Sequence, residues 1–117
     1  MRYFDTSEFD SPDVKGSGAE MDTNFLRLLD ELRHQCGFAF VINSGYRTRA
    51  HNKKVGGSPN SSHMKGLAVD ISCRSSAERY LIVKHAFELG FSRIGIANSF
   101  VHIDNDAEKP LQVIWTY

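Results

Sequence analysis

Two stretches of the chain carry apolar side chains at the i, i+3, i+4 spacing of an amphipathic helix. The first helix is predicted over residues 22–35, with Gly37 as its stop signal. Its apolar positions are Phe25, Leu28, Leu29 and Leu32. The second helix is predicted from Ser75 or Ser76, whose hydroxyl can cap it, to about Leu89. We expect these to be the two main helices of the protein.

Short runs rich in β-branched and aromatic residues predict strands between and after these helices. The runs are residues 38–42, 67–71, 93–97, 100–104 and 113–117. Asn43-Ser44-Gly45 has the composition of a turn, and Asn98-Ser99 that of a hairpin turn. Residues 48–55 are a candidate for a short additional helix. This pattern predicts an α+β fold with two main helices on a mostly antiparallel sheet.

Two polar stretches interrupt the pattern. Residues 1–20 hold few large apolar side chains and end in Lys15-Gly16-Ser17-Gly18, so we expect an irregular segment packed on the domain. Residues 56–62 contain no hydrophobic side chain. A loop of this composition inside a small domain is expected at the surface, where loops often carry function.

Length and composition indicate one ordinary globular domain over residues 1–117. Hydrophobic residues make up 41% and charged residues 24%, which are values typical of a globular protein. The 14 basic and 14 acidic residues give a net charge of zero. Because nucleic-acid binding needs a basic excess, we expect no nucleic-acid partner. We also expect the protein to be a monomer.

Neither a membrane span nor a secretory leader is visible. No apolar run approaches the roughly 20 residues that cross a bilayer. Residues 1–12 are polar and lack the apolar core of a signal peptide. We therefore expect synthesis in the cytoplasm, although a protein released by lysis or by a partner would show the same pattern. Cys36 and Cys73 match no CxxC motif and are expected to be free, partly buried thiols.

Three side chains stand out for their setting: His63, Asp70 and His102. His63 closes the polar loop, whereas Asp70 and His102 lie on predicted strands whose other residues are mostly apolar. Polar groups on neighbouring central strands are costly unless they are paired or liganded. Two imidazoles and one carboxylate form a typical catalytic zinc set, with the fourth position left to water. A satisfied hydrogen bond between a buried His and a buried Asp is the alternative that the residues alone leave open.

The sequence motifs around these residues resemble those of a known family. Ser44-Gly-Tyr-Arg-Thr48, Ser62-His-Met-Lys-Gly-Leu-Ala-Val-Asp70 and Phe100-Val-His-Ile-Asp104 occur in the order found in the zinc D-alanyl-D-alanine metallopeptidases. That superfamily also includes phage endolysin peptidases and the zinc domain of hedgehog proteins. Its pattern Ser-x-His-x-x-Gly-x-Ala-x-Asp is met by Ser61, His63, Gly66, Ala68 and Asp70. The resemblance covers roughly residues 25–104.

The resemblance implies a zinc cleft in which His63, Asp70 and His102 hold Zn²⁺. It also implies that Arg47 lies beside the metal and binds the substrate carbonyl or carboxylate, where a guanidinium can stabilise a developing oxyanion. Ser61 and His51 are further candidates for substrate binding. The implied substrate is the peptide of peptidoglycan, cut in its stem or in a cross-link, with carboxypeptidase and endopeptidase action both open. The protein would then act on the cell wall after release or export.

The general base departs from the family pattern. Many members carry Glu or Asp three residues before the last zinc histidine, and here that residue is Ser99. Asp104 is the nearest substitute, because it shares a strand face with His102. We leave two roles open for Asp104: the base, or a partner that orients a ligand histidine. A domain that binds zinc without catalysing a reaction is the alternative function.

The C-terminal residues complete the candidate site. Trp115 and Tyr117 alternate with polar or aliphatic neighbours on the last predicted strand, which favours core or edge packing over a substrate platform. Residues 105–110 form a polar loop near the site that is able to influence specificity.

Overall fold

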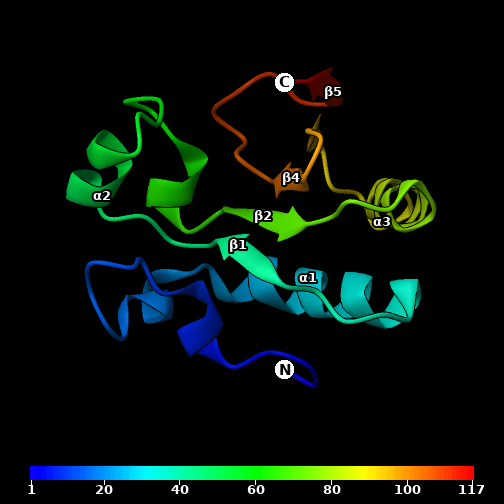
Figure 1. Ribbon diagram of the computed structural model, residues 1–117, viewed down its shortest axis with the longest axis horizontal. Coiled ribbons are helices and arrows are strands. Elements are labelled where there is room, and N and C mark those ends of the chain that lie inside the picture. Colours follow the sequence, from blue (N-terminus) through cyan, green and yellow to red (C-terminus); the bar gives the residue numbers. More distant parts are fainter.

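The computed structural model describes residues 1–117 (Figure 1). Two 3₁₀ helices, η1 and η2, open the chain; three α-helices, a third 3₁₀ helix and five strands follow. In chain order the elements are η1 (Thr6–Phe9), η2 (Ser17–Glu20), α1 (Thr23–Cys36), β1 (Ile42–Ser44), α2 (Arg49–Lys54), η3 (Ser62–Lys65), β2 (Ala68–Ser72), α3 (Ser76–Glu88), β3 (Arg93–Ile96), β4 (Phe100–Asp104) and β5 (Val113–Thr116).

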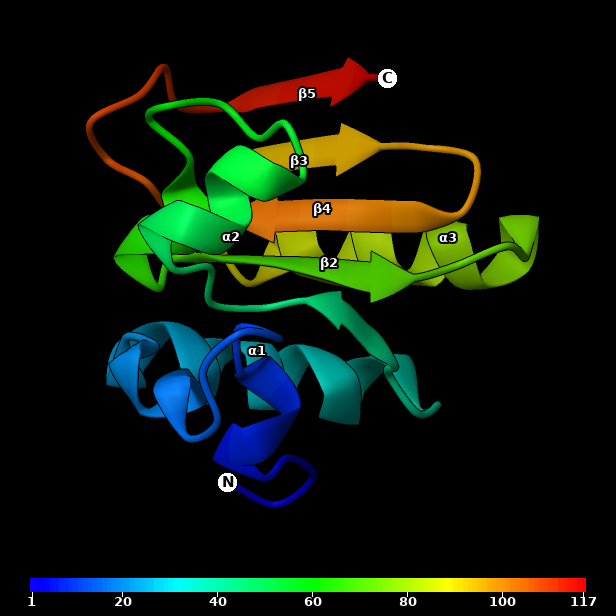
Figure 2. The same ribbon diagram turned by 60° about the vertical axis from the view of Figure 1, so that its left-hand side comes forward.

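The five strands form one sheet in the order β1-β2-β4-β3-β5. Every neighbouring pair is antiparallel except β3 and β5, which are parallel. Figure 2 shows α3 behind β2 and β4, whereas α2 lies in front of them. The helix layer and the apolar sheet face enclose the core, and the opposite face is left for the site. The predicted α+β fold with a mostly antiparallel sheet is thus confirmed.

Local sequence signals explain where the main helices begin and end. The Asp22 side chain accepts a hydrogen bond from the backbone N–H of Phe25 and caps α1, which Gly37 ends in the left-handed conformation. Ser75 caps α3 in the same way. Both α-helices match their predicted ranges to within two residues. No helix is long and apolar enough to cross a membrane, and Cys36 and Cys73 are free and buried.

The strand predicted over residues 38–42 is wrong in its position, because β1 begins only at Ile42. The aromatic side chains before it pack into the core without joining the sheet: Phe40 is buried and contacts the ring of Phe4. Val41 between them and the strand is 64% exposed. The register of β1 against β2 also shifts between Ile42 and Ser44, so the predicted turn at residues 43–45 begins inside a short, irregular strand.

The N-terminal segment supports the loop that follows β1. Phe9 is fully buried, and its backbone carbonyl accepts a hydrogen bond of 2.8 Å from Tyr46 N–H. A side chain at Gly45 would place its Cβ 2.7 Å from the Cα of Phe9, so only glycine permits this approach. Residues 1–20 therefore hold in place the residues on either side of Gly45.

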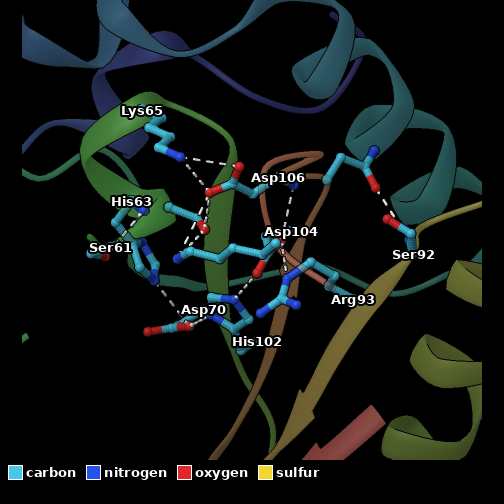
Figure 3. A network of polar contacts seen from close by, with 12 residues as sticks. Ser61, His63, Lys65, Asp70, Ser92, Arg93, His102, Asp104 and Asp106 are labelled. Carbon is cyan, nitrogen blue, oxygen red and sulfur yellow. Dashed lines mark hydrogen bonds and ion pairs between the residues drawn. The ribbon is translucent and has the colours of Figure 1, made fainter. Parts of the chain in front are cut away.

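A buried carboxylate fixes the loop between β4 and β5. Asp106 is only 1% exposed and accepts hydrogen bonds from Lys65 Nζ (2.9 Å), Ser62 Oγ (2.8 Å) and Glu108 N–H (3.1 Å) (Figure 3). Burial opposes its charge, but the bonds from Lys65 and Ser62 outweigh burial and lower the pKa of Asp106 to about 2. The loop is thereby tied to η3.

We expect Asp106→Asn to lower the free energy of unfolding by about 2 kcal/mol at neutral pH. A carboxylate whose folded pKa is depressed stabilises the fold above its ordinary pKa of about 3.9, and that stabilisation is lost as the pH falls toward about 2. The difference between wild type and variant should therefore shrink as the pH falls below about 4. Urea unfolding at a series of pH values measures it. Equal stability at neutral pH would contradict this assignment.

Candidate metal centre

Asp70 and His102 face each other across the two central strands. They are register partners on β2 and β4, and both are buried. Nδ1 of His102 lies 2.8 Å from Oδ1 of Asp70. Because successive side chains of a strand alternate between faces, both point away from the apolar helix layer. The strand pairing alone therefore brings a carboxylate and an imidazole together inside the domain.

His63 reaches the same point from η3. The 3₁₀ helix is capped by Ser61, whose hydroxyl accepts a hydrogen bond from His63 N–H at 3.2 Å. Nδ1 of the His63 ring lies 2.8 Å from the carbonyl oxygen of Gly45, which can only accept, so Nδ1 carries the proton. Nε2 then presents a lone pair, and it lies 3.4 Å from Oδ1 of Asp70.

One ligand atom from each of His63, Asp70 and His102 lies within 4.8 Å of the others, and all three residues are buried. Figure 3 shows the three side chains meeting from separate segments of the chain. Two imidazole nitrogens and a carboxylate oxygen are a donor set that suits a catalytic metal with an open position. The predicted trio is thus brought together, and it could hold a metal ion.

Asp104 lies on the other side of the His102 ring. Its Oδ2 is 2.7 Å from Nε2 of His102, while its Oδ1 accepts from Arg93 Nε at 2.9 Å and from Asp106 N–H at 3.0 Å. The carboxylate is only 1% exposed. A carboxylate on the second nitrogen of a ligand histidine fixes the tautomer and the orientation of the ring.

The charges of this cluster stabilise one another. Burial disfavours the ionised form of Asp70, yet contacts with His102 and His63 outweigh burial and lower the pKa of Asp70. Burial likewise opposes charge on His102, but Asp104 and Asp70 raise the pKa of His102. The pKa of Asp104 is lowered, because the contact with His102 and the Asp106 N–H outweigh its burial. Without a metal, the ring of His102 is therefore held between two carboxylates.

Arg47 stands at the edge of this cluster, as the resemblance implied. Its Nε donates to Ser44 Oγ at 3.0 Å, and its Nη1 donates to Asn52 Oδ1 at 3.2 Å. Its Nη2 is 3.7 Å from Oδ2 of Asp70. Asn52 is buried and also donates to the carbonyl of Ser58, so it joins Arg47 to the polar loop. The guanidinium is thus fixed in one orientation beside the three candidate ligands.

A cleft of about 380 Å³ opens over the cluster. Its lining residues are Arg47, Gly56, Gly57, Ser58, Ser61, Ser62, His63, Asp70, Arg93, Phe100, His102, Asp104, Lys109, Trp115 and Tyr117. His51 lies on α2 and is not among them, so its role in substrate binding stays a prediction. Trp115 and Tyr117, interpreted from the sequence as core or edge packing, form part of the cleft wall.

Comparison with known proteins agrees with this geometry. The sequence matches the family Peptidase M15 over residues 3–104, which is most of the chain. The chain belongs to the peptidase M15 family. No curated protein matches it. M15 peptidases are metal-dependent, and the cluster of His63, Asp70 and His102 gives this M15 chain a site where a metal could bind.

Sequence reasoning missed two charged residues that line the M15 cleft, Arg93 and Lys109. A signal for Arg93 was present. A hairpin turn at Asn98-Ser99 pairs Arg93 with Asp104, as the structure has it. Lys109 lies in the polar loop of residues 105–110 that was expected near the site, but the residue itself carried no signal, because its contact with Ser62 depends on how this loop folds over the sheet.

Gly95 explains how an edge-strand tryptophan reaches the centre of this M15 site. The register aligns Asp70, His102, Gly95 and Trp115 in one row across the sheet. A Cβ on Gly95 would lie 2.7 Å from the indole, so the ring lies over a position that only glycine leaves open. The Trp115 ring centroid is 5.5 Å from that of His102.

We expect Asp104→Asn to weaken metal binding about 10- to 100-fold, because the amide no longer fixes the His102 tautomer as a carboxylate does. Competition with a chromophoric chelator measures the affinity. Glu88→Gln is the matched control, since it removes a carboxylate that contacts His85 at 2.8 Å on α3, outside the cleft. Equal affinities for wild type and Asp104→Asn would refute the orienting role.

We expect Gly95→Ala to displace the indole of Trp115 and to lower the free energy of unfolding by about 1–3 kcal/mol through overpacking. Trp115 is the only tryptophan, so its fluorescence spectrum should shift. In a Trp115→Ala background the same substitution should lower the free energy of unfolding much less, because the indole ring is absent. Equal costs in the two backgrounds would contradict this packing.

Proposed function

We propose that this chain is a zinc-dependent peptidase that hydrolyses peptide bonds in peptidoglycan, within the stem peptide or a cross-link. The observation that carries the proposal is the buried convergence of His63, Asp70 and His102 in a cleft beside Arg47. The choice of zinc is supported by the donor set of two imidazoles and one carboxylate. The choice of peptidoglycan is supported by the resemblance of the sequence motifs to those of D-alanyl-D-alanine peptidases.

Zinc bound in this cleft would polarise the scissile carbonyl and lower the pKa of a water molecule. Arg47 would donate a hydrogen bond to the carbonyl oxygen as it gains negative charge. Ser44 and Asn52 already hold the guanidinium, so little reorganisation accompanies the reaction. Electrostatic stabilisation is most effective when donors are fixed in advance in this way.

For Asp104 we choose the orienting role over the role of base. Both of its oxygens already accept hydrogen bonds, and its pKa is lowered. By holding the proton on Nε2 of His102, Asp104 leaves Nδ1, the nitrogen on the Asp70 side of the ring, to bind the metal. We therefore do not assign to Asp104 the role of accepting the proton of the attacking water.

One observation favours a second candidate, a metal-binding module without hydrolytic activity. Asp70 and Asp104 are the only carboxylates among the residues that line the cleft, and both are engaged by histidines. Ser99, at the position of the acid in many relatives, is not a lining residue. This candidate shares the metal site with the peptidase and differs only in the absence of turnover.

Digestion of purified peptidoglycan tests the proposed function, and the release of new amino groups is the quantity measured. We expect release with zinc and none with a chelator. Arg47→Met should lower the rate about 100- to 1,000-fold with zinc still bound, as expected for the loss of an oxyanion donor. Arg49→Met is the matched control, because Arg49 is exposed on α2 and outside the cleft.

Asp104→Asn separates the two roles of Asp104. An orienting residue predicts that saturating zinc restores most of the activity, whereas loss of a base would leave the loaded variant inactive. Wild-type protein with one equivalent of zinc and no release of peptide amines would establish the non-catalytic module instead. Protein that takes up less than half an equivalent of zinc would end both proposals.

A further inference from the structure

Lys109 brings a second, separate charge into the cleft. It lies on the loop between β4 and β5, and its side chain is 21% exposed. Nζ donates to Ser62 Oγ at 2.9 Å. The Ser62 hydroxyl donates its own proton to Asp106 at 2.8 Å, so it can only accept from Lys109. An ammonium group has three N–H donors, and this contact uses one of them.

Asp106 does not satisfy the remaining donors of Lys109. The nearest Asp106 oxygen is 3.7 Å away, beyond hydrogen-bond distance. Both oxygens of Asp106 already accept from Lys65, and they also accept from Ser62 and from Glu108 N–H. The Lys109 ammonium therefore retains N–H groups that have no hydrogen-bond partner in the protein, and it lines the cleft.

The charge balance of the cleft points in the same direction. Arg93 contacts Asp104 at 2.9 Å, and Arg47 faces Asp70 at 3.7 Å, so each carboxylate of the cleft has its own guanidinium. Lys109 is a third cation of the cleft, and the carboxylate nearest to it, Asp106 at 3.7 Å, is shared with Lys65 at 2.9 Å and does not line the cleft. A divalent cation at the metal position would add further positive charge. A cleft of this kind favours a ligand that brings an anion.

We infer that Lys109 binds a carboxylate of the substrate, so that the preferred peptide carries an anionic group close to the scissile amide. The location of that amide rests on the proposed function. The carboxylate is either the free end of a peptide or the side chain of an acidic residue, since both present the same oxygens to an ammonium. Lys109 is then a specificity residue on the loop after β4, distinct from Arg47 on the carbonyl.

Isothermal titration of the zinc-loaded full chain with N-acetyl-D-alanine and with its amide tests the inference without turnover. We expect the wild type to bind the carboxylate at least tenfold more tightly than the amide. Lys109→Met should reduce this preference about 10- to 100-fold, in line with the loss of one charge-assisted hydrogen bond. Lys109→Arg should keep most of the preference, because the positive charge remains.

Lys65→Met is the matched control, since Lys65 contacts the same Asp106 at 2.9 Å but does not line the cleft. Its preference should stay at the wild-type value. An unchanged preference in Lys109→Met would overturn the inference, because zinc or Arg47 alone would then bind the carboxylate. An equal loss in Lys65→Met would also overturn it, because the effect would pass through Asp106.

The failure of the proposed function has a different signature. If the wild type binds the carboxylate through Lys109 but releases no amines from peptidoglycan, the anion site is supported and the proposed reaction is refuted. If peptidoglycan is hydrolysed but the preference for the carboxylate over the amide does not depend on Lys109, the reaction is supported and the anion site is refuted.

Discussion

The pairing of Asp70 with His102 across β2 and β4 is the constraint on which the rest of the site depends. Two polar side chains buried on adjacent central strands cost free energy unless each is satisfied. The structure satisfies both, through His63 on one side and Asp104 on the other. The same row continues through Gly95 to Trp115. One register thus sets two of the three candidate ligands, the orienting carboxylate and part of the cleft wall.

Two segments outside this row hold loops against it. The N-terminal segment fixes Gly45, whose carbonyl fixes the His63 ring. Asp106 ties the loop after β4 to η3 and leaves Lys109 turned toward the cleft. Because buried hydrogen bonds fix these loops, the polar face of the sheet becomes a preorganised site. The apolar face and the two main helices supply the stability that this arrangement requires.

Much of this could be predicted from the sequence, and the reasons for the rest are physical. The spacing of Leu29 and its apolar neighbours predicted α1, and alternation predicted that His102 and Asp104 share a face. The run at residues 38–42 misled, because aromatic side chains can fill a core without strand pairing. Lys109 could not be assigned, since its contact with Ser62 joins segments that are distant in sequence.

The central claim is that the two histidines would bind a metal ion through different ring nitrogens, Nε2 of His63 and Nδ1 of His102. Nitrogen-15 NMR of the histidine side chains in zinc-loaded protein tests it most directly. The account predicts zinc on Nε2 of His63 with a protonated Nδ1, and zinc on Nδ1 of His102 with a protonated Nε2 facing Asp104. Zinc on Nε2 of His102, or signals from both rings that do not respond to zinc, would contradict it.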